Sequence, residues 1–217
     1  MTSPLILASA SPARTKLLRD AGIVHRIVVS DVDEDAATAS AGPLAPAETA
    51  LLLARAKAES VAAGITGGLS DGDPADGALV LGCDSVFEFD GFPYGKPWEP
   101  EVARDRWRQM RGRSGILHTG HWLISTLHSR HDAATPFARG EVTSAVVRFE
   151  EVSDAEIDAY VATGEPLLVA GAFTIDGLAG AFISGIEGDP HTVVGLSIST
   201  LRRLLGQAGV SITELWV

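Results

Sequence analysis

The sequence contains little cysteine and little lysine. Cys83 is the single cysteine, so no disulfide can form within the chain, and we expect a reducing compartment, the cytoplasm. Only three of the 17 basic residues are lysines, namely Lys16, Lys57 and Lys96, and the others are arginines. A lysine in such a chain indicates a position where a compact ammonium charge is needed and a guanidinium fork is not.

Positive charge and long apolar runs are also scarce. The formal net charge is -11 and the pI is near 4.9, which argues against nonspecific binding to nucleic acid polymers or anionic membranes. No stretch approaches the roughly 20 apolar residues of a membrane span, and the short apolar start lacks the positive charges of a signal peptide. We therefore expect a cytoplasmic chain that forms a single domain over residues 1–217, with a core of one unit or of two lobes sharing a cleft.

The most informative segment is a predicted hairpin in the middle of the chain. Leu79–Leu81 is a continuous apolar run typical of a buried strand, and Asp90–Gly91 is a two-residue turn signal. This pattern places Asp84 at the end of the core strand, with Ser85 opposite Lys96 and Asp84 diagonal to that lysine. Two interpretations remain open with about even weight: a structural ion pair that closes the hairpin, and a functional site.

The start of the chain predicts a possible anion site. A strand over Leu5–Ala8 leads into a helix that begins with Ser11 as N-cap and Pro12 as first residue, and that ends at Ala21. A strand, a tight turn and a helix N-terminus together present free backbone N–H groups to an anion. Arg14 opposes the helix dipole, which indicates a negative partner nearby. The alternative, which this segment alone favours, is an ordinary capped helix with a surface arginine.

Two further charged features precede the hairpin. A second strand is predicted over Ile27–Val29, and the acidic run Asp31–Asp35 after it offers either a solvated turn, the commoner outcome, or oxygen ligands for Mg²⁺. A helix is predicted over Ala47–Ala63, ended by Gly64, and Lys57 lies on its apolar stripe. This lysine either extends to the edge of the helix or points into a polar cleft.

The rest of the chain predicts an alternation of helices and strands. Residues 64–77 predict a mobile loop. The further predicted elements are a helix over Pro100–Arg111, an antiparallel pair of strands over Ile116–Leu127 and Glu141–Glu150, a helix from a capping box at Ser153 to Thr163, a helix over Ser199–Gln207 and a last strand over Val210–Trp216.

Taken in order, these motifs resemble the Maf-like nucleotide pyrophosphatases, a family also known from septum formation. Each motif is modest alone, but their order is specific, and the resemblance spans nearly the whole chain. The segments that carry it are Leu7–Arg14, Ser30–Glu34, Ala56–Ala58, Cys83–Ser85, Gly95–Pro97, Gly164–Pro166, Ala170–Phe173 and Gly188–Asp189.

The resemblance implies a fold, a reaction and a set of site residues. The implied fold is a mixed α/β fold with an elongated twisted sheet in two lobes, flanking helices and a central substrate cleft. The implied reaction is hydrolysis of a nucleoside triphosphate to the monophosphate and pyrophosphate with a divalent metal such as Mg²⁺, Mn²⁺ or Co²⁺. Asp84 matches the catalytic base and a metal ligand, and Glu34 lies near the metal. The residues expected near the phosphates are Ser9, Ser11, Arg14, Lys57 and Lys96.

The chain departs from the family pattern where substrate choice is concerned. Val169 and Asp176 stand where many members have Lys and Gln, and Gly115 and Thr192 replace a usual His and Asn. We therefore expect the base pocket to match unmodified pyrimidines less well.

Three functional hypotheses follow: a triphosphate pyrophosphatase with relaxed or pyrimidine preference, the same chemistry on modified nucleotides such as 7-methyl-GTP, and a nucleotide-binding cell-division regulator with little turnover. The oligomeric state is left open, a homodimer included.

Overall fold

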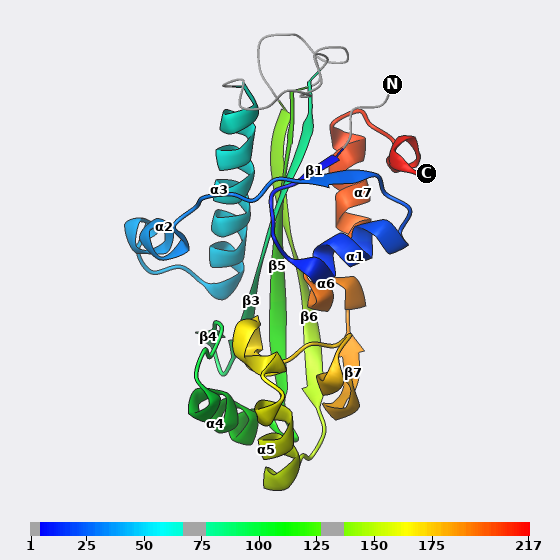
Figure 1. Ribbon diagram of the computed structural model, residues 1–217. Coiled ribbons are helices and arrows are strands. Elements are labelled where there is room, and N and C mark those ends of the chain that lie inside the picture. Colours follow the sequence, from blue (N-terminus) through cyan, green and yellow to red (C-terminus); the bar gives the residue numbers. More distant parts are fainter. Residues whose placement is uncertain (1–4, 67–76, 127–136) are drawn as a thin grey trace.

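The architecture is a mixed seven-stranded sheet with helices on both faces (Figure 1). The structure is a computed structural model and describes residues 5–66, 77–126 and 137–217. The strand order is β2-β1-β3-β5-β6-β7, and β4 pairs with β3 outside this order. β1 runs parallel to β2 and β3, and the other pairs are antiparallel. The predicted mixed α/β class is therefore confirmed.

The strands are β1 Leu5–Leu7, β2 His25–Ile27, β3 Leu79–Phe89, β4 Phe92–Tyr94, β5 Ser114–Ser125, β6 Phe137–Phe149 and β7 Ile183–Glu187. The α-helices are α1 Pro12–Asp20, α2 Glu34–Ala41, α3 Pro46–Thr66, α4 Pro100–Met110, α5 Asp154–Ala162, α6 Pro190–Val194 and α7 Ile198–Gln207. Short 3-10 helices are η1 Glu165–Leu168, η2 Ala170–Ala172, η3 Leu178–Phe182 and η4 Ile212–Leu215. Among the described residues, none of the helices has both the length and the apolar character that a membrane crossing requires.

Three apolar clusters divide the two faces of the sheet. Side chains alternate along a strand, so odd and even residues of β3 have different neighbours. On the odd face, Leu81 packs with α1 and α7 in one half, and Phe87 packs with α4 and α5 in the other. On the even face, Val80 packs under α3. We call the even side the α3 face; in its other half, around Glu88, none of the three clusters covers the sheet.

Glycines on the α3 face allow α3 to lie directly on the strands. A Cβ atom at Gly82 would meet the carbonyl oxygen of Ala54 at 2.0 Å, and one at Gly120 would meet that of Ala50 at 2.3 Å. The helix residues in contact are alanines, and Ala50, Ala54 and Ala58 are fully buried. Because alanines of α3 meet glycines of the strands, the axis of the helix lies close to the sheet. The side chain of Lys57, on the same helix, therefore also starts close to the strands.

Several predicted elements are confirmed at the level of their hydrogen bonds. Ser11 caps α1 by accepting from the backbone N–H of Arg14, and Ser153 and Glu156 form the predicted capping box of α5. The hairpin turn is correct, with Phe89 paired to Phe92. The long antiparallel pair of β5 and β6 is also correct, and its predicted end at Leu127 lies outside the described residues, as does most of the predicted loop, residues 67–76.

The prediction that Asp84 ends the core strand is wrong. β3 continues to Phe89, because Val86, Phe87 and Phe89 remain buried and sustain the strand beyond the aspartate. Asp84 therefore lies in the middle of the strand. The α3 helix also extends past Gly64 to Thr66, so that glycine does not end it.

Other differences arise from capping that the predictions did not include. Asp33 accepts from the backbone N–H of Ala36 and begins α2, a helix that was not predicted, within the acidic run Asp31–Asp35. The predicted last strand is instead the helix η4, because Ser211 and Glu214 form a capping box. β2 lies two residues earlier than predicted, and β7 and α6 were not predicted.

We expect Gly82→Ala to lower the free energy of unfolding by about 1–3 kcal/mol, because the added methyl group overlaps the backbone of α3. Urea unfolding measures this change. Gly206→Ala is the matched control: Gly206 lies in α7 with no atom within 4 Å of its added Cβ, so alanine there should stabilise by up to about 1 kcal/mol. Equal stability of Gly82→Ala and wild type would show that the close helix–sheet approach is not a constraint.

Candidate active site

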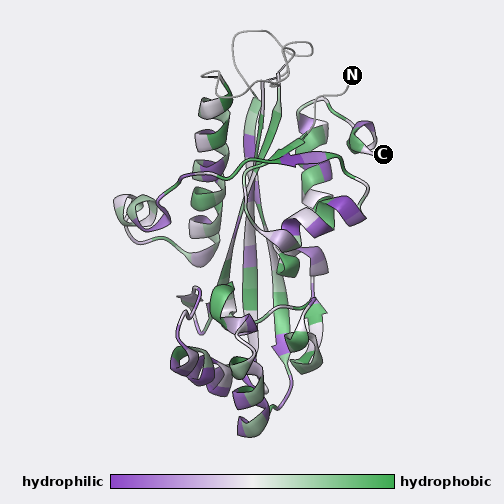
Figure 2. Cartoon of the chain, in the orientation of Figure 1, coloured by the Kyte–Doolittle hydropathy of each residue, from purple (hydrophilic) through white to green (hydrophobic). Residues whose placement is uncertain are grey.

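The site lies at the edge of β3 that pairs with β1 in one part and with β4 in another. β1 pairs with β3 only as far as Leu81, whose carbonyl accepts from the N–H of Ala8 at 2.8 Å. β4 pairs with the same edge only from Phe87 onward. Between these two strands, no strand of the described residues pairs with that edge, and Asp84 lies within this interval. Figure 2 shows hydrophilic segments in the long central strands, between more hydrophobic parts.

Asp84 is paired with a lysine that comes from α3. The ammonium Nζ of Lys57 is 2.6 Å from Oδ1 of Asp84 and 2.8 Å from Oε1 of Glu34. The side chains of Lys57 and Asp84 are 11% and 12% exposed, whereas that of Glu34 is 50% exposed. Burial raises the pKa of the Asp84 carboxyl, and the cations of Lys57 and Arg14 offset this effect only in part. The sequence therefore predicted three residues that the structure brings into contact.

Arg14 is held by a second set of neighbours at the turn between β1 and α1. Its Nη1 donates to Ser9 Oγ at 2.9 Å, its Nε to the carbonyl of Gly195 at 2.7 Å, and its Nη2 to Ser85 Oγ at 3.3 Å. Arg14 is buried, and within the described part of the chain it forms no ion pair. The negative partner predicted for this arginine is thus not a carboxylate of the described chain. Ser11 lies beside this group, and its backbone N–H donates to Ser9 Oγ at 3.3 Å.

Lys96 is not the partner that the hairpin register indicated. The register itself is correct, but the pairing with β4 ends at Phe87 and Tyr94, before Lys96 is reached. Lys96 is exposed and its Nζ lies 5.2 Å from the ring centre of Trp98, a cation–π contact. Lys57 takes the expected place beside Asp84. Trp98 was not predicted; it is 61% exposed and has a φ of 62°, a conformation that bulky residues adopt rarely.

Two hydroxyl groups that bond to each other, those of Ser85 and Thr119, were also not predicted and support the Arg14 side of the site. Ser85 Oγ lies 2.9 Å from Thr119 Oγ1, which donates to the carbonyl of Thr192 at 2.8 Å. These contacts join β3, β5 and α6. The cross-strand position of Thr119 opposite Ser85 was the available signal, but it required the β3–β5 register, which the sequence pattern does not specify.

A buried histidine positions the segment that carries Gly195. Nε2 of His121 accepts from the backbone N–H of Ser197 at 2.8 Å, and Ser197 caps α7. An accepting ring nitrogen is unprotonated, and burial lowers the pKa of His121 to about 4, with Arg14 adding to this effect. The neutral ring is therefore part of the folded structure.

The described residues provide two carboxylates for a divalent cation. No group of three or more His, Cys, Asp or Glu side chains with metal-binding geometry occurs among them. Glu34 and Asp84 nevertheless approach the same ammonium. Mg²⁺ commonly binds proteins through one or two carboxylates and completes its six ligands with waters and substrate phosphates. The donor set fits that mode of binding.

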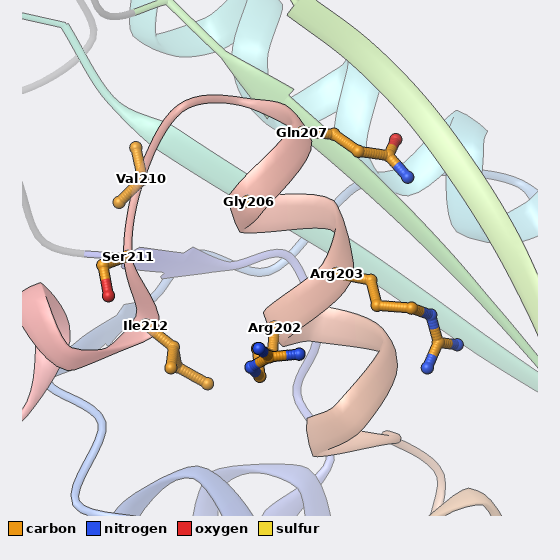
Figure 3. Close-up of a pocket in the computed structure, with 7 residues that line it drawn as sticks. All are labelled: Arg202, Arg203, Gly206, Gln207, Val210, Ser211 and Ile212. Carbon is orange, nitrogen blue, oxygen red and sulfur yellow. The ribbon is translucent and has the colours of Figure 1, made fainter.

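Two other features do not take part in this site. A surface depression lies at the end of α7, on the opposite face of the sheet from α3, and none of the predicted site residues lines it (Figure 3). Its lining residues are Arg202, Arg203, Gly206, Gln207, Val210, Ser211 and Ile212. Cys83 is next to Asp84 in sequence but faces the α7 core, where burial raises the pKa of its thiol to about 12. A protonated thiol is a poor nucleophile.

A family model and several curated proteins match the chain over nearly its whole length. A family model described as Maf-like protein matches residues 4–208. The chain is 56% identical over 216 residues to a nucleoside triphosphate pyrophosphatase of Leifsonia xyli subsp. xyli, an alignment that covers 98% of this chain and 96% of the relative. It is 53% identical to a protein of the same name from Streptomyces coelicolor, covering 98% and 94%. A solved structure, the Staphylococcus aureus Ham1 protein, covers 99% of this chain and 94% of that one at 14% identity and a TM-score of 0.38.

We expect the free energy of unfolding to fall as the pH drops from about 6.5 toward 4, because the unfolded chain then binds a proton that folded His121 excludes. The contribution of this histidine is fully present above pH 6.5, and about 3 kcal/mol is lost by pH 4. Urea unfolding over this range should show a shallower pH dependence for His121→Gln. His191→Gln, which changes an exposed histidine, should keep the wild-type slope. Identical slopes in all three proteins would contradict a buried neutral ring.

Proposed function

The chain belongs to the Maf-like protein family, and from this premise we propose that it hydrolyses nucleoside triphosphates to nucleoside monophosphates and pyrophosphate. The names of its relatives support this activity. The observation that carries the proposal is the arrangement at the free edge of β3, where a buried carboxylate, Asp84, lies between Lys57 and the uncompensated Arg14. Because Arg14 forms no ion pair with the described residues, its charge is suited to a polyanionic substrate.

The phosphates are bound by residues from both sides of this edge. Arg14 is fixed by neutral acceptors, so its charge is available to a phosphate oxygen. Ser9 and Ser11 lie at the N-terminus of α1, where free N–H groups and the helix dipole favour an anion. Lys57 reaches the site from α3, and the exposed Lys96, which follows β4 and contacts the ring of Trp98, turns toward the terminal phosphates when they bind.

Asp84 acts as the general base. Its carboxylate accepts a proton from a water whose oxygen bonds to the α-phosphorus, while the bond from that phosphorus to the bridging oxygen breaks and pyrophosphate leaves. Burial raises the pKa of this carboxyl, which makes it a better proton acceptor, and Lys57 keeps it ionised and oriented. The cations of Arg14 and Lys57 stabilise the negative charge that gathers on the leaving group.

Glu34 and Asp84 are the residues that would hold a divalent metal. When bound, Mg²⁺, Mn²⁺ or Co²⁺ neutralises phosphate oxygens, so that the carboxylates and the polyanion can share one site. Glu34 is suited to this role because its side chain is half exposed at the start of α2 and is fixed by Lys57 on one side only.

The finer details of the function belong to the same proposal. Val169 and Asp176 lack the amine and amide that would read unmodified pyrimidines, which favours relaxed specificity or modified nucleotides such as 7-methyl-GTP. The single buried cysteine and the acidic charge support a cytoplasmic enzyme of one domain that does not bind nucleic acid polymers or membranes. The alternative function is a regulator of division with little turnover, and pyrophosphate release tests it. The oligomeric state is a separate question, and sedimentation tests whether the protein is a homodimer.

Asp84→Asn is the direct test of the base. The variant keeps the shape of the side chain but loses its charge, so turnover should fall about 10²-fold to 10⁴-fold. Its melting temperature without metal should hold or rise, because a costly buried charge is removed while Lys57 keeps Glu34 as a partner. Product chromatography with a nucleoside triphosphate panel and Mg²⁺, Mn²⁺ or Co²⁺ measures turnover, beside a melting curve. A folded variant that retains more than about a tenth of the activity would exclude Asp84 as base.

The three lysines provide a matched set for the phosphate contacts. Lys57→Ala and Lys96→Ala should both reduce kcat/KM for the best triphosphate by at least about tenfold, because each removes a cation from the phosphates. Lys16→Ala is the control, since Lys16 forms an exposed pair with Asp20 on α1. Lys57→Ala should also lower the melting temperature, because the buried Asp84 loses its ammonium partner. Wild-type kinetics in both site variants would remove these lysines from the site.

A further inference from the structure

The segment between β4 and α4 contains Lys96 and is attached to the rest of the protein at both of its ends. At its start, the pairing of β4 with β3 ends at Tyr94. Near its far end, the backbone N–H of Trp98 donates to the carbonyl of Leu167 in η1 at 3.1 Å. Gly95 and Lys96, which lie between these two points, are exposed. The contacts that hold this backbone therefore determine where the ammonium of Lys96 can reach.

An arginine of α4 holds the segment between its two ends. Nη1 of Arg106 donates to the carbonyl of Gly95, the first residue after the strand pairing, and α4 lies next to β4 in the fold (Figure 1). The guanidinium of Arg106 lies 5.0 Å from the ring centre of Tyr94, a cation–π contact. Lys96 thus follows directly on a residue that α4 fixes.

Arg106 differs from the other arginines of this helix. Arg104 and Arg108 pair with carboxylates, and so does Arg111 at the C-cap. Arg106 forms no ion pair within the described part of the chain, and burial lowers the pKa of its guanidinium. A cation that loses water without gaining a carboxylate is costly. The bond to the carbonyl of Gly95 accounts for its position.

Gly95 makes the bond from Arg106 consequential. A Cβ atom at Gly95 would meet no atom within 4 Å, and Gly95 is not among the glycines with a positive φ. Neither packing nor backbone conformation therefore requires a glycine at this position. Glycine has more conformational freedom than any other residue, so without an external contact the segment could adopt many conformations. The hydrogen bond from Arg106 restricts that freedom directly before Lys96.

We propose that Arg106 is a positioning residue for Lys96. By holding the carbonyl of Gly95, it keeps the backbone of Lys96 where the ammonium can leave the ring of Trp98 and reach the terminal phosphates. The inference rests on the proposed function, which assigns Lys96 to those phosphates. A backbone that is already held reduces the ordering entropy that phosphate binding costs. Arg106 acts through Lys96 and does not itself bind phosphate.

A double-mutant cycle tests whether Arg106 acts through Lys96. In Arg106→Ala, kcat/KM for the best nucleoside triphosphate with Mg²⁺ should fall about 3-fold to 10-fold, mainly through a higher KM, because one hydrogen bond is lost. In a Lys96→Ala background the same change should have less than about a twofold effect, because no ammonium is left to position. Arg106→Lys, which keeps a donor for the carbonyl, should recover most of the loss. Arg108→Ala, which breaks an exposed pair with Asp105 on the same helix, should keep wild-type kinetics.

Three results would overturn the inference: wild-type kinetics in Arg106→Ala, wild-type kinetics in Lys96→Ala, or a loss from Arg106→Ala that is equally large with and without Lys96. The last result would show that Arg106 binds phosphate directly or acts on the fold as a whole. If Arg106→Ala does not fold, as judged by its melting curve, Arg106→Gln takes its place in the cycle, because its shorter polar side chain also removes the guanidinium.

Calorimetric affinity for pyrophosphate with Mg²⁺ separates this inference from the proposed function, because it requires no turnover. Pyrophosphate contains the terminal phosphates alone, so Arg106→Ala should weaken its binding when Lys96 is present and not when Lys96 is replaced. A protein that shows this coupling but releases no pyrophosphate from any triphosphate would overturn the function and keep the positioning role. Turnover without the coupling would overturn the positioning role and keep the function.

Discussion

The pairing of Lys57 with Asp84 depends on how closely α3 lies on the sheet. An isolated carboxylate in the middle of a buried strand is costly, and the ammonium that offsets this cost comes from a helix 27 residues earlier in the chain. Lys57 reaches Asp84 because alanines on α3 face glycines on β3 and β5. A larger residue at any of these contacts would move the lysine outward. The chemistry of the site therefore depends on an apolar contact that contains no functional group.

The free edge of β3 explains why charges of both signs collect there. Asp84 points to the α3 face and Ser85 to the opposite face, so the edge is reached by Lys57 from one side and by Arg14 from the other. Neither face alone brings the two cations together. No strand of the described residues pairs with β3 in the interval between β1 and β4, and the hydrogen bonds from Ser85 through Thr119 to the carbonyl of Thr192 hold the Arg14 side in place.

Sequence patterns predicted what depends on local structure. The Ser11 cap, the capping box of α5 and the hairpin turn each depend on residues a few positions apart, so the sequence pattern specifies them. Lys57 was identified because a lysine on the apolar stripe of a helix is unexpected. The predicted partner of Asp84 was wrong, since the hairpin pattern indicated a register but not where pairing stops. The bond from Arg106 to the carbonyl of Gly95 could not be predicted, because it depends on how α4 lies against the segment after β4. The roles of the site residues in catalysis stay predictions.

The length of β5 and β6 affects how the molecule can move. Both strands run unbroken through the two apolar cores of the odd face, Leu123 in one and Leu117 in the other. Two halves joined by continuous, hydrogen-bonded strands cannot rotate about a flexible connection, as two domains joined by a loop can. A relative motion would require the strands to bend or change their twist. Any change in the distance between the two halves is thus opposed by the hydrogen bonds that β3, β5 and β6 share.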